Sequence, residues 1–561
     1  MPKISIYERD LTTAGSSELT DNTVYIPGYA VIGPVNTPTL CESLEDFQEI
    51  FGYKPYKFRQ KQDYPTAFGL EESYAFKDSY EKSYIYAAEL LKNGLHVIFE
   101  RFMPTSFINT WTAVLKNDYV IGTIESNTHF NIKAKFPGEL GKDIKVTLTS
   151  SEYLKNTQGA VGKKYKLDAV LPKNVEKGIY RDLKDSITFT FDVNRADYYE
   201  NVINETKYID VFIKGEPELV DFAESNLMFT STTVAPSDEF IISNFYAAME
   251  DNSLFEKLAD RNEYRLKFIT SGSYPTFDYN PTNSDNVTVY QKIVGNMLTV
   301  AAQRGDAIAL IDHTNNLSKS VEDIYGDLNS LDDLKGLTSK EIEIGGDASK
   351  QEDARKYGAM FTPWATYESK VLSSAVILPA SFAYLNSLAV SVRTNANWYA
   401  IAGVTRGLVP NLLQLSQPIT GSVANKIQDE KGISINPITN IKPYGYCIWG
   451  NRTLNENNGL VASSFLNVRN LASDVKKVVY TAAKKLTFEL NTDVLWLNFK
   501  AEIEPTLDRM VSGNGLTGYK IMRKTSTKRA TIEAVIRLYV VEAVENWDIT
   551  VELSDTTVTV Q

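Results

Sequence analysis

The sequence predicts a multidomain protein of mixed α+β and α/β class, in which an α/β core carries a β-rich inserted domain and extended strands at both ends. Three observations lead to this fold class. The 561 residues are too many for one hydrophobic core. Residues 236–375 alternate helical with buried-strand patterns. Residues 106–235 alternate apolar with polar side chains, as half-buried strands do.

We expect six segments along the chain, separated where the hydrophobic period and the composition change. The segments are an N-terminal arm over 1–20, the N-terminal part of the core over 21–105, a β-rich, outward-facing insert over 106–235, an α/β domain over 236–375, the C-terminal part of the core over 376–545 and a C-terminal strand arm over 546–561. No internal repeat of fixed period is present in the sequence.

Residues 1–20 have the pattern of a short strand without an evident partner in its own domain, and a last short strand follows Asp555. A Thr/Ser/Gly-rich stretch after the first strand provides a flexible link. Two interpretations stay open, a frayed terminus or a strand that pairs with the sheet of a neighbouring subunit. The strand residues are Ile4, Ile6 and Tyr7 at the N-terminal end and Thr557, Val558 and Val560 at the C-terminal end.

The N-terminal part of the core begins with a strand at Val24 and continues with a short helix from Ser43 to Gly52. Serine is a preferred N-cap residue, and glycine is a typical helix stop. A tyrosine-rich helical stretch then ends at Gly94 and leads into a strand from Val97. The acidic residues around these tyrosines favour packing and subunit contact over stacking on nucleic acid.

The α/β domain is predicted from a strand over 266–270, a helix over 289–303 and a fully buried strand over 307–312. No glycine-rich phosphate-binding fingerprint follows these strands, which argues against a Rossmann or P-loop protein. The acidic connector over 322–352 is expected to be a solvated surface segment.

Residues 371–392 carry no charge over about the length of a membrane-spanning helix. Pro379, Asn386 and five serines interrupt the hydropathy of this stretch. We therefore predict a buried strand over 375–378, followed by a helix with Ser381 as its N-cap. Direct membrane insertion is not expected.

Composition narrows the classes of function. The net charge of -12 argues against nucleic-acid coating as the main task. Two cysteines and three histidines provide neither a disulfide framework nor a metal cluster. We expect no metal, no cofactor and no nucleic-acid partner.

Two sets of polar residues could carry chemistry, and both are interpreted as structural. Asp312 and His313 lie at the C-terminal end of a buried strand, where α/β enzymes place catalytic groups, but no nucleophile motif accompanies them. Three carboxylates surround Pro505 and suit the first turn of a solvated helix. These carboxylates are Glu502, Glu504 and Asp508. No catalytic residue is assigned.

A basic run stands out near the C-terminus of this acidic chain. It is either a solvated loop or a patch that docks an acidic partner surface with salt-sensitive affinity. Nucleic acid is disfavoured because Tyr519 is the only aromatic residue beside the run. The run consists of Lys520, Arg523, Lys524, Lys528 and Arg529.

The last third of the chain carries a specific series of motifs. They are Trp449-Gly450-Asn451-Arg452-Thr453-Leu454, Thr487-Phe488-Glu489-Leu490-Asn491 with Leu495-Trp496, and Gly513-Asn514-Gly515-Leu516-Thr517-Gly518-Tyr519. In this order and spacing they resemble the C-terminal half of contractile tail sheath proteins, found in myophages and related injection machines. The match is weaker in the middle of the chain, and Ile401-Ala402-Gly403 replaces the family's Pro-Ala-Gly. The residues assigned to the sheath motif are Trp449, Gly450, Arg452, Thr453 and Trp496.

The resemblance implies a mixed α/β sheath core and a structural, non-enzymatic subunit. Such a subunit polymerises helically around an inner tail tube and contracts from a metastable extended state to drive the tube through the host envelope. The terminal strands of neighbours would join a core sheet. Residues 470–520 would face the tube, with the basic run as a possible contact. Further implied partners are baseplate and tail terminator proteins, in a virion tail assembled in the cytoplasm of a bacterial host.

Two alternatives remain. The chain could be the sheath of a phage-derived bacteriocin or of a secretion-type contractile injector, which would use the same architecture. From a different class, an α/β hydrolase-like enzyme with a β insertion would fit the element pattern but lacks a visible site. An enzyme would form small oligomers, whereas a sheath would form tubes.

Overall fold

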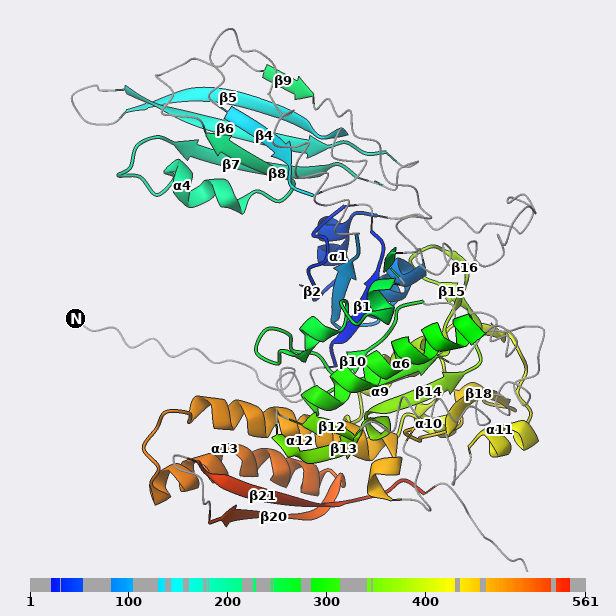
Figure 1. Cartoon of the computed structure of the whole chain (residues 1–561). Helices are drawn as coiled ribbons and strands as arrows, with labels where there is room; N and C mark the ends of the chain where they lie inside the picture. The colour runs from blue at the N-terminus through cyan, green and yellow to red at the C-terminus, as the bar shows by residue number, and fades with distance from the viewer. Residues whose placement is uncertain are drawn as a thin grey trace, which may run out of the picture.

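An eight-stranded sheet lies at the centre of the computed structural model (Figure 1). Its six inner strands run parallel, and each edge strand is antiparallel to its neighbour. One sheet therefore joins strands from the segments 21–105, 236–375 and 376–545. In spatial order the strands are β19 (Gly445–Ile448), β18 (Ile435–Ile441), β14 (Gly358–Thr362), β11 (Ile308–Asp312), β10 (Phe268–Ile269), β1 (Val24–Gly28), β3 (Val97–Arg101) and β2 (Thr39–Cys41).

The structure describes residues 22–30, 32–53, 82–103, 130–136, 143–154, 161–174, 179, 181–213, 225–228, 244–245, 247–273, 284–312, 341–344, 347–428, 434–454, 461–525 and 531–544. The predicted arms over 1–20 and 546–561 lie outside these ranges. His313, Lys528 and Arg529 lie outside them as well.

Helices cover both faces of the sheet, as a parallel sheet requires. Alternate strand residues point to opposite faces, so that Ile269 and Met360 belong to one core cluster and Phe268 and Phe361 to the other. The first face is covered by α6 (Ser284–Arg304), the 3-10 turn η4 (Glu256–Ala259) and α11 (Gly421–Ile427). The second face is covered by α1 (Leu44–Phe51), a helix over residues 82–92 and α9 (Ala380–Ser391).

The capped helix predicted between Ser43 and Gly52 is confirmed as α1. The backbone N–H of Asp46 donates to Ser43 Oγ at 3.1 Å, which satisfies one of the free donors of the first turn. Gly52 ends the helix with a φ of 76°, a conformation that glycine adopts without steric cost. Phe47 and Phe51 form its buried face and pack against Phe99 of β3.

The β-rich segment forms two antiparallel sheets that lie beyond α1, at the top of Figure 1. A core of its own holds these sheets together, with Tyr165 stacked on Phe189 at 5.6 Å. The four-stranded sheet contains β7 (Leu183–Thr190), β6 (Val161–Leu171), β5 (Lys145–Leu154) and β9 (Ser225–Met228), and the two-stranded sheet contains β4 (Phe130–Ala134) and β8 (Ile209–Ile213). Two short helical turns, α4 (Tyr199–Val202) and η3 (Ile203–Glu205), follow β7.

Polar contacts join this β-rich segment to the end of α1. Tyr208 Oη donates a hydrogen bond to the carbonyl of Glu49 at 2.8 Å, and Arg181 pairs with the Glu49 carboxylate at 3.4 Å. The arginine also lies over the ring of Tyr53. The contacts with α1 are partly exposed, so each ion pair contributes little to stability.

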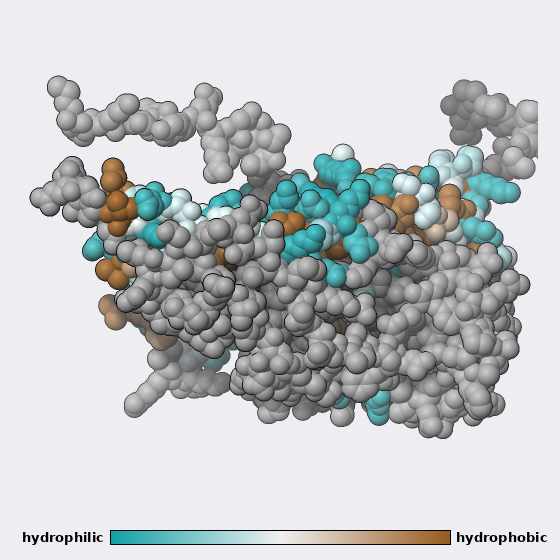
Figure 2. All heavy atoms as spheres, turned by 90° about the horizontal axis from the view of Figure 1, so that it is seen from above, coloured by the Kyte–Doolittle hydropathy of each residue, from teal (hydrophilic) through white to brown (hydrophobic). Residues whose placement is uncertain are grey.

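Seen from above, the described part of the outer face is mostly hydrophilic, with scattered hydrophobic residues (Figure 2).

A helical layer with a hairpin lies on the opposite side of the sheet from the β-rich segment (Figure 1). Its inner surface has a small core around Leu471, Leu507 and Met510. The layer contains α12 (Leu466–Lys485), α13 (Asp493–Ser512), β20 (Leu516–Lys524) and β21 (Glu533–Val540). The smaller remaining elements are the sheet of β16 (Ser374–Leu378), β15 (Ala365–Ser369) and β17 (Leu412–Leu415), the hairpin of β12 (Glu341–Ile344) and β13 (Asp347–Asp353), and the turns η5 (Ala354–Tyr357), α10 (Gly403–Arg406) and η6 (Ala462–Ser464).

The predicted mixed α/β fold class is confirmed, and so are the strand and helix expected within 371–392. Within the described ranges, no helix has the length and apolar character needed to cross a membrane. The N-cap assigned to Ser381 is wrong, because Pro379 occupies the cap and Ser381 lies in the first turn. The hydroxyl and the backbone N–H of Ser381 instead bind Asp312.

One further sequence interpretation is wrong, and one stays a prediction. The last part of the acidic connector forms the β12–β13 hairpin, while residues 322–340 lie outside the described ranges, so its surface position stays a prediction. Pro505 does not start a helix but lies inside α13, which begins after the cap residue Thr492. Thr492 Oγ1 accepts from the N–H of Leu495 at 3.2 Å, and proline is tolerated at 505 because that side of the helix is exposed, so water can bind the freed carbonyl.

Candidate functional site

The Trp449–Leu454 motif is a backbone strap that fastens α12 to the central sheet. It follows edge strand β19, and its backbone contacts both sides. The N–H of Leu454 donates to the carbonyl of Gly358 on β14 at 2.9 Å. The N–H of Leu466, at the start of α12, donates to the carbonyl of Asn451, also at 2.9 Å. Asn451 and Asn467 add a side-chain bond at 2.7 Å, which fixes the first turn of α12.

Asn436 on β18 is the polar centre of this strap. It is fully buried, and its side chain uses both donor and acceptor atoms. Nδ2 donates to the carbonyls of Met360 at 3.0 Å and Arg452 at 2.8 Å, while Oδ1 accepts from the N–H of Arg452 at 2.7 Å. The Asn436 side chain therefore supplies hydrogen bonds to the backbone of Arg452 that a neighbouring strand would otherwise supply. The sequence offered a signal for Asn436, a polar residue inside the apolar run 435–438.

The motif residues have different roles around Asn436. A Cβ on Gly450 would lie 2.7 Å from Asn436 Oδ1, so only glycine fits there. Arg452 is buried and lies over the ring of Phe465 at 5.0 Å. Thr453 Oγ1 donates to the carbonyl of Ser463 at 2.8 Å. Trp449 is 41% exposed.

Trp496 is not part of the strap, although the sequence pattern grouped it with the strap residues. It lies on α13, where its ring stacks on Phe499 at 5.6 Å. The structure thus brings together Trp449, Gly450, Arg452 and Thr453 and separates Trp496 from them. The first four belong to the strap, and the fifth belongs to the helical layer that the strap attaches.

The C-terminal hairpin is a two-stranded sheet, and no further described strand pairs with either of its edges. Its inner face, which includes Ile521 and Leu538, packs on the helical layer. Its outer face carries Lys520 opposite Arg537 in the strand register. A hairpin edge without a strand partner among the described residues can be a template for strand addition.

The basic run divides between the two faces of the hairpin. The solvated-loop interpretation is wrong for Lys520, Arg523 and Lys524, because all three lie on β20. Arg523 faces the helices, where its guanidinium pairs with Asp493 and hydrogen-bonds Asn491, each at 2.9 Å. Lys520 and Lys524 are exposed. Arg523 is exposed as well, although it is already paired at the start of α13, and Lys528 and Arg529 lie outside the described ranges.

α13 carries apolar residues on two faces. Leu495, Ile503, Leu507 and Met510 are buried against the rest of the layer. On the other face, Val494 and Leu497 are 64% and 61% exposed. The loop before the helix adds Leu490, which is 81% exposed, and Phe488, which is fully exposed. Large apolar side chains exposed near one another at the start of a helix mark a surface that a partner can cover.

Phe488 has an unusual backbone as well as an exposed ring. Its φ of 75° is in the left-handed region, which costs energy for a bulky aromatic residue. We name Phe488, Leu490, Val494 and Leu497 the outer apolar patch. The sequence motif included Phe488, but only the fold reveals that its side chain is free of intramolecular packing.

Asp312, the acidic residue considered for catalysis, is a buried structural acceptor. Its Oδ1 accepts from the N–H of Ser381 at 2.6 Å, and its Oδ2 accepts from the hydroxyl of Ser381 at 2.9 Å. Tyr86 Oη lies 2.9 Å from the same hydroxyl. Burial raises the pKa of Asp312 to about 7, and the bonds from Ser381 oppose this rise. The arrangement fixes the start of α9 beside β11.

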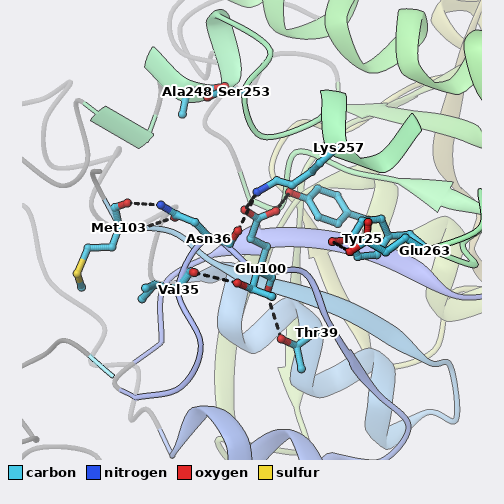
Figure 3. A network of polar contacts seen from close by, with 12 residues as sticks. Tyr25, Val35, Asn36, Thr39, Glu100, Met103, Ala248, Ser253, Lys257 and Glu263 are labelled. Atoms are coloured by element: carbon cyan, nitrogen blue, oxygen red, sulfur yellow. Dashed lines mark hydrogen bonds and ion pairs between the residues drawn. The ribbon is translucent and has the colours of Figure 1, made fainter. Parts of the chain in front are cut away.

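A second polar network lies where the chain leaves the sheet for the β-rich segment (Figure 3). Glu100 at the end of β3 is fully buried, accepts from Tyr25 Oη at 2.7 Å and pairs with Lys257 of η4. Asn36, with a φ of 53°, exchanges two hydrogen bonds with the backbone of Met103, at 2.7 and 2.9 Å. Burial raises the pKa of Glu100, while Lys257 and Tyr25 lower it. Sequence reasoning missed this network, because its members are far apart in the chain.

The assigned arm residues Ile4, Ile6, Tyr7, Thr557, Val558 and Val560 lie outside the described ranges. The described residues contain no group of three or more His, Cys, Asp or Glu side chains placed to hold a metal ion. What the described geometry provides is a set of surfaces suited to assembly, namely an open-edged hairpin and an outer apolar patch on a firmly attached layer.

The described features are an open-edged hairpin and exposed apolar side chains, and the comparisons with known proteins add one sequence match to them. No protein-family model matches the chain. The tail sheath protein of Vibrio phage KVP40 is 28% identical over 127 residues, or 22% of this chain. The chain spans 18% of the length of that relative. The resemblance to tail sheath proteins found in the sequence is thus confirmed by a curated sequence match.

Solved structures with a similar trace include a sheath tail protein and a chain of a prophage baseplate. A sheath tail protein from Listeria innocua is 10% identical, with a TM-score of 0.47 over 93% of this chain and 95% of its own. A chain of the anti-feeding prophage baseplate in the contracted state is 14% identical, with a TM-score of 0.46 over 99% of this chain and 98% of its own.

Replacing Asn436 with alanine tests the strap. The change leaves two carbonyls and one N–H unpaired in a buried site, so we expect a loss of about 3 kcal/mol or more in the free energy of unfolding. Urea denaturation followed by fluorescence measures it. Asn440, exposed on the same strand, is the matched control, and its alanine variant should change stability by less than about 0.5 kcal/mol. Equal effects of the two variants would contradict the role of Asn436.

Replacing Asp312 with asparagine tests the buried carboxylate. The folded-state pKa is about 7, whereas an unfolded carboxyl titrates near 3.9. Wild-type stability should therefore fall as pH rises from about 4 to 7, by at most about 1.4 kcal/mol per pH unit. Asparagine can keep both contacts with Ser381 but does not titrate. The stability of the variant should therefore lack this fall with rising pH. Urea unfolding across the pH range measures it, and parallel pH profiles for the two proteins would contradict it.

Proposed function

We propose that this chain is the structural subunit of a contractile tail sheath. It polymerises helically around an inner tail tube and contracts from a metastable extended state, which drives the tube through the host envelope during genome delivery. The observation that carries this proposal is the curated sequence match to a phage tail sheath protein. In this proposal the chain works without a catalytic site or cofactor, as part of a virion tail assembled in the cytoplasm of the host.

The open-edged hairpin supports a specific mode of polymerisation. An arm over 1–20 and a strand over 546–561 would pair with the hairpin sheet of neighbouring subunits. Such contacts are head-to-tail, and they generate open helical filaments when the rotation between copies does not close a ring. Main-chain hydrogen bonds along added strands would keep subunits connected while their rigid parts move. The insert over 106–235 would face outward, on the side away from this layer.

The outer apolar patch supports a contact between the helical layer and the inner tube. Val494 and Leu497 lie on one side of α13, and Phe488 and Leu490 precede the helix. Lys520 and Lys524 of the neighbouring hairpin are exposed and could pair with acidic groups of the tube protein. In this arrangement the tube covers the apolar side chains that the subunit leaves in water. Baseplate and tail terminator proteins would bind at the two ends of the polymer.

The driving force for contraction can come from binding energy alone. Rigid subunits that slide into larger mutual contacts gain free energy without a nucleotide. A gain of about 1.4 kcal/mol per subunit shifts each equilibrium about tenfold, and about 100 coupled copies would release on the order of 140 kcal/mol. The extended state then persists for kinetic reasons until a trigger releases it.

Deleting residues Met1–Asp21 tests the arm. Full-length protein should form tubes or polysheaths in negative-stain microscopy, whereas the truncated protein should remain as small particles because its strand donor is gone. Thermal unfolding should be nearly the same for both, since the described core begins at Asn22. A Lys3→Ala variant is the control and should assemble. Small monodisperse particles from the full-length protein would contradict the sheath proposal.

Replacing Leu497 with aspartate tests the outer apolar patch. A charge on this exposed side chain should weaken cosedimentation with the inner tube protein by about tenfold or more, because the contact would bury an unpaired carboxylate. Thermal stability should change by less than about 0.5 kcal/mol, since the residue is on the surface. Leu497→Met keeps an apolar side chain at the same position and should bind normally. If the aspartate variant bound as well as wild type, the patch would not be the tube contact.

A further inference from the structure

Two consecutive side chains, Asn397 and Trp398, connect the two terminal regions of the described chain. Asn397 is 2% exposed and exchanges two hydrogen bonds with the side chain of Asn22, at 3.0 and 3.2 Å. Trp398 Nε1 donates to the carbonyl of Gly513 at 2.9 Å. Asn22 directly follows residues 1–21, and Gly513 lies between α13 and the C-terminal hairpin.

A buried ion pair supports the Asn397 side of this connection. Asn397 Nδ2 also lies 3.5 Å from a carboxylate oxygen of Asp474 on α12. Lys267 Nζ binds both oxygens of that carboxylate, at 2.8 and 2.9 Å, and both side chains are almost fully buried. Losing one partner of such a pair leaves an uncompensated buried charge, so the pair resists separation. The backbone N–H of Lys267 further donates to the carbonyl of Thr23 at 2.8 Å.

The Trp398 side is fixed by close packing. A Cβ on Gly513 would lie 2.5 Å from the indole ring, and one on Gly515 would lie 2.8 Å from it. The ring therefore sits directly against the backbone that leads into β20. Asn467 adds a hydrogen bond to the carbonyl of Trp398 at 3.3 Å, from the first turn of α12. Both residues of the pair are thus held by α12 as well as by their distant partners.

We propose that Asn397 and Trp398 form a junction that transmits tension within each subunit, from the root of the N-terminal arm to the C-terminal hairpin. This inference rests on the proposed function, in which the arm of one subunit pairs with the hairpin sheet of the next. Tension on the arm reaches Asn22 first. Asn397 receives it through the paired amides, and Trp398 passes it to Gly513, where the hairpin begins. These contacts lie beside the covalent connection from Asn22 into β1 and give the load a second route, which leads to the hairpin.

The first test measures hydrogen exchange around Asn22, the root of the arm, in the unassembled full-length chain. Asn22→Ala removes the amide pair but leaves residues 1–21 and the ion pair in place. Hydrogen exchange of peptides spanning the root should become about tenfold faster, while exchange in β1 stays unchanged. Asn395→Ala is the matched control, because the bonds of Asn395 stay within its own turn, to Ser391 and Thr394. Unchanged exchange at the root in Asn22→Ala would overturn the inference.

The second test measures tubes under load. Tubes of wild type, Asn22→Ala, Trp398→Phe and the double variant are sheared under the same conditions, and their lengths are measured by negative-stain microscopy. Trp398→Phe keeps an aromatic ring but loses the bond to Gly513. We expect each single variant to give shorter tubes. Tubes of the double variant should be no shorter than those of the worse single variant. The two contacts lie one after the other, so losing either one already interrupts the path.

The outcomes separate the two proposals. Absence of wild-type tubes would overturn the sheath function and the tension path with it. Wild-type tubes together with unaltered lengths for both single variants would overturn the junction alone. Lengths that shorten independently in the double variant would also overturn it, since they would indicate two separate contacts. Trp398→Phe keeps the test decisive if Asn22→Ala fails to fold.

Discussion

The attachment of α12 to the central sheet is the interaction on which the rest of the structure depends. Lys267, just before β10, and Asp474 on α12 form a buried ion pair, and Asn436 binds the strap that leads into the same helix. Buried charges and amides are costly unless all their partners are in place. They therefore admit one position of α12 on the sheet, and through α12 they set the positions of α13 and the hairpin.

This rigid attachment explains why the layer can expose so much apolar surface without losing its shape. α13 uses one face, including Ile503 and Leu507, to pack inward. The outer apolar patch makes no comparable intramolecular contact, and neither hairpin edge has a strand partner among the described residues. A surface that is ordered before binding loses little conformational entropy when a partner covers it. The proposed assembly thus uses a preformed face of each subunit.

The buried charged groups of the described core join elements of the fold. Asp312 positions α9 beside β11, and Glu100 with Lys257 joins the end of β3 to η4. Burial raises the pKa of both carboxyls, a property that active-site acids share. Here each carboxyl is engaged by hydroxyl, backbone or ammonium donors from another segment. Their shared role is to define how distant parts of the chain meet, which suits the rigid-body movement of the proposed assembly.

Local sequence determined much of this protein by itself. The cap at Ser43, the strand ending at Asp312 and the neutral strand–helix stretch are fixed by neighbouring residues, because capping and hydrophobic period act over a few positions. The motif from Trp449 to Leu454 could likewise be recognised in the sequence. Its purpose could not, since it depends on Asn436, whose partners come from β14 and the strap.

Only the tertiary structure decided which polar residues meet and which apolar residues stay uncovered. Asn22 and Asn397 are separated by 375 positions, and no local pattern pairs them. Pro505 looked like a helix start because proline and acids suit a first turn, yet the cap at Thr492 and the inward packing of α13 placed it mid-helix. Hydrophobic period identifies a helix and its apolar residues. Which of its faces is covered depends on elements that the fold brings from elsewhere, and so on contacts that no single stretch of sequence contains.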